Sequence, residues 1–134
     1  DVNSDGRIDV LAALNQKDAM PDTRVGRLLR NRSGALAGPS YLGNFPARTR
    51  AVVVADFNGD LDPDLAVIGY SGSTLDIRRG SGTGGFSGSS VLSSPVPLAS
   101  SPYQMVVGDF NQDCKPDVAI SFESNSPIVF LTSH

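Results

Sequence analysis

The chain has 134 residues, of which 40% are hydrophobic and 19% are charged, and its formal net charge is −3. This composition excludes a disordered chain and fits one ordinary globular domain. No run of 18 apolar residues is present, so we expect no membrane span, and the acidic balance with few aromatic residues argues against nucleic-acid binding.

The first unit opens with an acidic loop, Asp1–Asp9, which is followed by the apolar run Ile8 to Leu14. A second short run covers Val25 to Arg30 and leads into the turn Asn31–Gly34, which Leu36 closes. Both runs have the length and the flanking turn formers that are typical of β-strands. The sequence Asn31-Arg32-Ser33 is also a glycosylation sequon on this turn.

The second unit repeats this order and adds a strand in front of it. Ala51 to Ala55 is rich in β-branched residues and precedes the acidic loop Asp56–Asp64. Strands are expected next at Leu65 to Tyr70 and at Thr74 to Arg79, before a glycine-rich turn that ends at Phe86. A fourth, more polar strand is expected after the turn in each of these two units.

The third unit contains the expected strands Tyr103 to Gly108, Val118 to Phe122 and Pro127 to Leu131, with the loop Asp109–Asp117 between the first two. The loops therefore begin 55 and then 53 residues apart. A constant period of this size indicates a repeat architecture.

Oxygen-bearing side chains recur at positions 1, 3, 5 and 9 of each loop, a spacing that suits a hard cation such as Ca²⁺. The loops hold ten acidic and two basic residues, which is a net charge of −8, whereas the rest of the chain has four acidic and nine basic residues. We expect cations to offset this repulsion. The predicted side-chain ligands are Asp1, Asn3, Asp5, Asp9, Asp56, Asn58, Asp60, Asp64, Asp109, Asn111, Asp113 and Asp117, and the predicted main-chain ligands are the carbonyls of Arg7, Asp62 and Lys115. Asp62 also adds an acid to the second loop.

Four strands in roughly 54 residues, without a helical period, are typical of a β-propeller blade. The expected fold is all-β, with blades of four antiparallel strands in an incomplete propeller of about two and a half blades. The division is a partial blade at 1–50, a complete blade at 51–102 and a partial blade at 103–134. Inner strands covered on both faces explain the unbroken Val and Ala runs.

The tracts from Val52 to Val67 and from Val106 to Ile120 resemble the FG-GAP/VCBS repeat of integrin-α-like propellers, and the turn closing on Phe86 is similar to that family's glycine-and-phenylalanine motif. The resemblance implies calcium in the hairpin loop between the first two strands of each blade. The family's glycine at the sixth loop position is kept only as Gly6, so Leu61 and Cys114 are expected to adopt a conformation that favours glycine.

A calcium loop of the EF-hand or dockerin type is an alternative, but it needs a carboxylate at position 12, where this chain has Ala12, Val67 and Ile120. The only histidine is the terminal His134, so no catalytic triad can be assembled and we expect no enzyme activity. The arginines are expected at ordinary solvated positions.

The first functional hypothesis is an extracellular, secreted or cell-surface binding, adhesion or scaffolding module for glycans or proteins, because calcium loops of modest affinity suit the millimolar calcium outside cells. Its other partners would be the remaining blades or further copies of itself. The alternatives are an accessory domain of a secreted carbohydrate-active enzyme and a structural subunit of a self-assembling fibre or ring.

Overall fold

The computed structural model describes residues 1–14, 24–43, 45, 48–70, 72–90, 95–123 and 129–131. Its strands are β1 (Val10–Ala13), β2 (Val25–Leu28), β3 (Ser40–Leu42), β4 (Thr49–Ala55), β5 (Asp64–Gly69), β6 (Thr74–Gly80), β7 (Phe86–Ser90), β8 (Val96–Pro97), β9 (Pro102–Gly108), β10 (Asp117–Phe122) and β11 (Val129–Leu131). The described ranges contain no helix, and accordingly none that could cross a membrane. The fold is therefore all-β, as expected.

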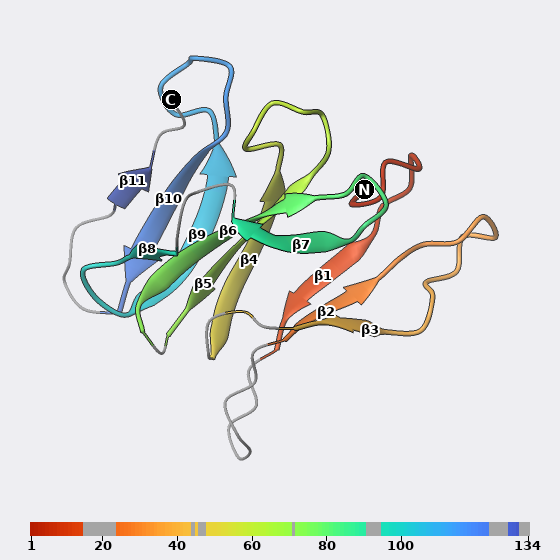
Figure 1. Ribbon diagram of the computed structural model, residues 1–134, viewed down its shortest axis with the longest axis horizontal. Helices are drawn as coiled ribbons and strands as arrows, with labels where there is room; N and C mark the ends of the chain where they lie inside the picture. The colour runs from red at the N-terminus through yellow and green to blue at the C-terminus, as the bar shows by residue number, and fades with distance from the viewer. Residues whose placement is uncertain are drawn as a thin grey trace.

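The strands form three antiparallel sheets, which follow one another along the molecule (Figure 1). Sheet 1 has the order β1-β2-β3, sheet 2 the order β4-β5-β6-β7, and sheet 3 the order β11-β10-β9. The short strand β8 also pairs with β6 in sheet 2. This arrangement is that of incomplete propeller blades, since the described sheets do not close into a ring.

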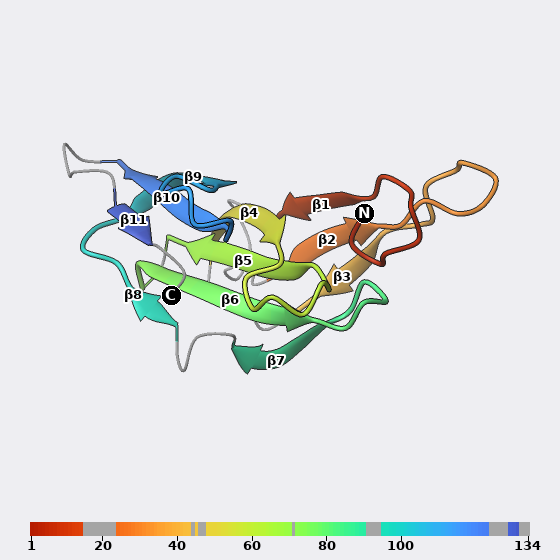
Figure 2. The ribbon, with the colours of Figure 1, turned by 90° about the horizontal axis from the view of Figure 1, so that it is seen from above.

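The core lies between the sheets, which stack face to face (Figure 2). All six residues of β5 are buried, and its four central side chains, from Leu65 to Ile68, alternate between two hydrophobic clusters. Leu65 and Val67 pack toward sheet 1, whereas Ala66 and Ile68 pack toward sheet 3. The facing residues are Val25 and Phe45 on one side and Met105, Val118 and Ile120 on the other. This two-sided burial confirms the interpretation of the unbroken apolar run.

The strand expectations are confirmed with small shifts and two corrections, except that only residues 129–131 of the predicted strand Pro127 to Leu131 are described, as β11; its first two residues lie outside the described ranges. The fourth strands exist as β3 and β7, and strands rather than helices follow all three loops, so the EF-hand alternative is wrong. The predicted start of the first strand at Ile8 is also wrong, because β1 begins at Val10 and the Ile8 side chain is 75% exposed. Strand β8 was not expected from the sequence, since its two residues carry no periodic pattern. The unit boundaries at residues 50/51 and 102/103 remain predictions.

The interpretation of the arginines as ordinary solvated residues is wrong for Arg78. Its side chain is 14% exposed and pairs with the buried Asp76, with 2.8 Å between Nη2 and Oδ2. Its guanidinium also lies over the Phe45 ring, 4.2 Å from the centroid. Arg78 therefore joins sheet 2 to the segment that follows sheet 1, which strand periodicity alone did not reveal.

Candidate functional site

The three acidic loops lie along the same edge of the three sheets, which is the upper edge in Figure 1. We call residues 1–9, 56–64 and 109–117 loop 1, loop 2 and loop 3, and the edge they form the loop edge. Loop 2 connects β4 to β5 and loop 3 connects β9 to β10, so each is the tip of an antiparallel hairpin. Pairing of the flanking strands thus fixes where each loop begins and ends.

The position-1 carboxylate organises each loop by accepting backbone N–H groups from the opposite side of the turn. In loop 2, Asp56 Oδ1 accepts from Asp60 N at 3.1 Å and Oδ2 accepts from Leu61 N at 2.8 Å. The same two bonds occur in loops 1 and 3, where the acceptors are Asp1 and Asp109 and the donors are Asp5, Gly6, Asp113 and Cys114. Three copies with identical connectivity form one structural motif.

Positions 3 and 5 continue this pattern. Asn58 Oδ1 accepts from Asp60 N at 2.8 Å, and Asp60 Oδ1 accepts from Asp62 N at 3.0 Å. The equivalent acceptors in the other loops are Asn3, Asp5, Asn111 and Asp113. Each bond orients a side-chain oxygen within the turn, as short polar side chains do in tight turns.

The position-9 carboxylate ties the loop to its sheet. Asp64 is fully buried; its Oδ2 accepts from Phe57 N at 3.0 Å and its Oδ1 from Gly80 N at 2.8 Å, at the end of β6. Burial raises the pKa of Asp64, and these two N–H groups partly counter that effect. Asp9 makes the corresponding pair of bonds with Val2 N and Arg30 N.

Asp117, the position-9 residue of loop 3, differs in one oxygen. It is fully buried, and its Oδ2 accepts from Phe110 N at 2.9 Å. Its Oδ1 is enclosed and has no hydrogen-bond partner among the described residues. In loops 1 and 2 the corresponding oxygen accepts from a backbone N–H two residues beyond the strand residue that pairs with Val10 or Leu65, and the equivalent position after β11 lies outside the described residues.

Two backbone positions in every loop are left-handed. At position 6, Gly6 has φ 80°, Leu61 has φ 70° and Cys114 has φ 65°. The expectation that Leu61 and Cys114 adopt a glycine-like conformation is therefore confirmed. The sequence reasoning missed position 4, where Ser4, Gly59 and Gln112 also have positive φ. Of these three residues, only Gly59 is of a type that could have indicated a positive φ from the sequence.

Basic side chains pair with two of the position-5 carboxylates. Arg7 Nη1 lies 2.9 Å from Asp5 Oδ2, and Arg79 Nη2 lies 2.7 Å from Asp60 Oδ2. Desolvation pulls the pKa of Asp5 upward, but hydrogen bonds from Asn3 and Arg7 and the charge of Arg7 outweigh it, so the pKa is lowered. The pKa of Asp60 is lowered mainly by the Asp62 N–H, with a further contribution from Arg79. The sequence reasoning predicted neither ion pair, because it used Arg7 only as a main-chain carbonyl ligand.

The described residues contain no converging group of three or more acidic, His or Cys side chains, because the carboxylates turn toward backbone N–H groups. The donor set nevertheless fits Ca²⁺, which takes carboxylate, carboxamide and main-chain oxygens. Each loop supplies these oxygen types at the predicted side chains. Whether the predicted ligands act as ligands, including the carbonyls of Arg7, Asp62 and Lys115, remains a prediction.

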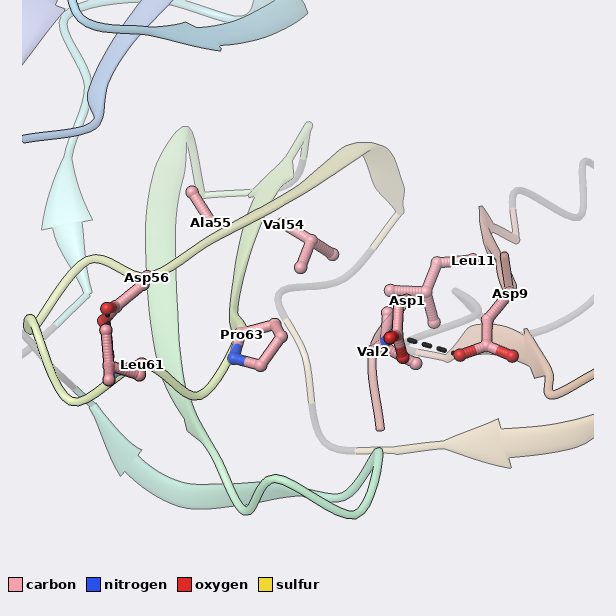
Figure 3. Close-up of a pocket in the computed structure, with 9 residues that line it drawn as sticks. All are labelled: Asp1, Val2, Asp9, Leu11, Val54, Ala55, Asp56, Leu61 and Pro63. Atoms are coloured by element: carbon pink, nitrogen blue, oxygen red, sulfur yellow. Dashed lines mark hydrogen bonds between the residues drawn. The ribbon is translucent and has the colours of Figure 1, made fainter. Parts of the chain in front are cut away.

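Two hollows separate the loops along the loop edge. The hollow between loops 1 and 2 has a volume of about 400 Å³ and is lined by Asp1, Val2, Asp9, Leu11, Val54, Ala55, Asp56, Leu61 and Pro63 (Figure 3). A smaller one, of about 190 Å³, lies between loops 2 and 3 and is lined by Asp56, Phe57, Asn58, Gly59, Cys114, Lys115 and Pro116. The loop edge is therefore a row of oxygen-rich turns with recesses between them.

A comparison with protein-family models matches the FG-GAP-like repeat twice, at residues 1–67 and 56–120. No curated protein and no solved structure matches the chain. The two matches together span residues 1–120 and include all three loops. The chain belongs to the FG-GAP-like repeat family.

Proposed function

We propose that the chain is a calcium-stabilised, propeller-type binding module of a secreted or cell-surface protein, with a glycan or protein as its ligand. Repeats of this family form propeller-like, non-enzymatic binding modules and are typical of extracellular or surface proteins. The observation that carries the proposal is the threefold repetition of one hydrogen-bonded, oxygen-rich loop along a single edge.

Calcium would be held by the oxygens at positions 1, 3, 5 and 9, with a main-chain carbonyl at position 7. The bound ion would supply positive charge where the loops carry a net charge of −8. The chain's own contribution is to hold each carboxylate by its backbone N–H bonds before an ion arrives, which lowers the cost of ordering the ligands.

The ligand surface in this proposal is the loop edge. Three large apolar side chains are exposed there, Leu61 at 87%, Ile8 at 75% and Phe110 at 49%, and Leu61 also lines the hollow between loops 1 and 2. Exposed apolar side chains grouped with polar groups around a recess are typical of recognition surfaces.

The calcium part is tested by thermal unfolding in excess chelator and after addition of millimolar CaCl₂. Preferential binding to the folded state should raise the melting temperature in proportion to the logarithm of the calcium concentration. MgCl₂ at equal ionic strength is the control. Superimposable unfolding curves with chelator and with calcium would refute a structural calcium role.

The ligand part is tested by screening the calcium-loaded protein on immobilised glycans and extracellular-matrix proteins. For any ligand found, Leu61→Asn should reduce binding without unfolding the loop, because Asn tolerates positive φ. Leu36→Asn is the matched control, since Leu36 is a 42% exposed residue outside the loops. Equal losses in both variants would place the ligand surface elsewhere.

A further inference from the structure

Loop 2 differs from the other two loops in where its positive charge comes from. Position 7 is basic in loops 1 and 3, as Arg7 and Lys115, whereas it is Asp62 in loop 2. Loop 2 thus contains four acidic residues and no basic one. Its only ion pair in the described structure is made by a residue outside the loop, Arg79 near the end of β6.

The contact is made to an enclosed oxygen. Asp60 Oδ1 accepts from Asp62 N, while Oδ2 is shielded from solvent and lies 2.7 Å from Arg79 Nη2. The Asp60 side chain is 23% exposed, and that of Arg79 is 59% exposed. The largely exposed guanidinium of Arg79 therefore forms an ion pair with an enclosed carboxylate oxygen of the loop.

The register of the sheets shows that loop 1 has no corresponding cation on its neighbouring strand. Leu65 pairs with Arg78, and Val10 pairs with Leu28, so the sheet 1 counterpart of Arg79 is Leu29. Leu29 cannot supply a charge, and in loop 1 the pairing with Asp5 falls to Arg7 instead. Loop 2 therefore has Asp62 in place of a basic residue at position 7, and its basic partner is Arg79 on β6.

We propose that Arg79 is a built-in counter-cation of loop 2, which holds the loop to β6 without metal and competes with Ca²⁺ for Asp60. This inference rests on the proposed calcium role of the loops. Two consequences follow from one contact: removing the guanidinium weakens the metal-free protein, and it strengthens calcium binding at loop 2 because the ion no longer shares Asp60 with a second positive charge.

The test is a calcium titration of the ¹⁵N-labelled protein followed by NMR, because the amide resonances of Leu61 and Asp62 report on loop 2 and that of Gly6 reports on loop 1. In Arg79→Gln the dissociation constant at loop 2 should fall about three- to fivefold, the scale of an exposed ion pair. The value at loop 1 should not change. The melting temperature in chelator should also fall.

Two further variants separate charge from folding effects. Arg79→Lys keeps the charge and should stay close to the unsubstituted protein in both measurements. Arg32→Gln removes an arginine from an exposed turn of sheet 1 and should change neither.

An unchanged or weaker calcium affinity at loop 2 in Arg79→Gln would overturn the inference, as would an unchanged melting temperature in chelator. Absence of any calcium response at loop 2, with responses at loops 1 and 3, would overturn the inference and leave the proposed function standing. Absence of a response at all three loops would overturn both.

Discussion

The position-9 carboxylates offer a graded test of the loop motif, because Asp64 uses both oxygens and Asp117 uses one among the described residues. Replacing either by Asn keeps the shape but turns one oxygen into an N–H donor. In Asp64→Asn, whichever way the amide is oriented, its NH₂ group faces a backbone N–H, from Phe57 or from Gly80. One buried acceptor is lost and one donor is left unsatisfied.

The magnitude follows from these contacts. A hydrogen bond to a charged group contributes about 1.5–3 kcal/mol. Part of this free-energy loss is offset because the substitution also removes a buried charge, and burial disfavours the ionised form of Asp64. We expect a net loss of about 2 kcal/mol of unfolding free energy, which corresponds to roughly 7 °C in melting temperature for a chain of this length. In Asp117→Asn the amide oxygen can face Phe110 N and the NH₂ group can take the Oδ1 position, so the loss should be about 1 kcal/mol or less.

The assay is chemical denaturation of both variants in excess chelator, so that metal binding does not contribute. Asp62→Asn is the control. It removes a carboxylate from the same loop, and the hydrogen bond of Asp62 with Asp60 is made by its backbone N–H, not by its side chain. Equal destabilisation in Asp64→Asn and Asp117→Asn would show that Asp117 Oδ1 also accepts a hydrogen bond, as the equivalent oxygens of Asp9 and Asp64 do. No destabilisation in Asp64→Asn would refute the stabilising role of the two hydrogen bonds that Asp64 accepts from Phe57 N and Gly80 N.

Two other predictions concern backbone conformation. Leu61→Gly should raise the unfolding free energy by about 0.5–1 kcal/mol, because relief of the left-handed strain at φ 70° exceeds the entropic cost of glycine; a loss of stability in denaturant titrations would contradict this. Gly80→Ala should cost several kcal/mol or abolish folding, since a Cβ there would lie 2.0 Å from the Pro63 carbonyl oxygen, whereas Gly38→Ala meets no atom within 4 Å and should be neutral by circular dichroism melting.

Much of the architecture could be predicted because its signals are local. The unbroken run from Leu65 to Ile68 indicated a strand buried on both faces, and both clusters are present. The loss of glycine at position 6 indicated left-handed residues at Leu61 and Cys114, which the backbone angles confirm. These features depend on neighbours along the chain, so spacing and residue type were sufficient.

The rest depends on which side chains meet across strands. Sequence spacing predicted Asp64 as a metal ligand, but it did not reveal that both its oxygens bind backbone N–H groups from loop 2 and β6. The burial of Arg78 against Asp76 and the reach of Arg79 to Asp60 depend on strand register and on the direction each side chain takes. Residue type alone does not fix either.

The most direct test of a calcium-stabilised loop edge is a crystal structure of the protein grown in millimolar calcium, with anomalous data collected at long wavelength. We expect one anomalous peak inside each loop, bounded by the side-chain oxygens of positions 1, 3, 5 and 9 and the main-chain carbonyl of position 7. Well-ordered loops with no peak, in crystals that hold calcium in the surrounding solution, would contradict it.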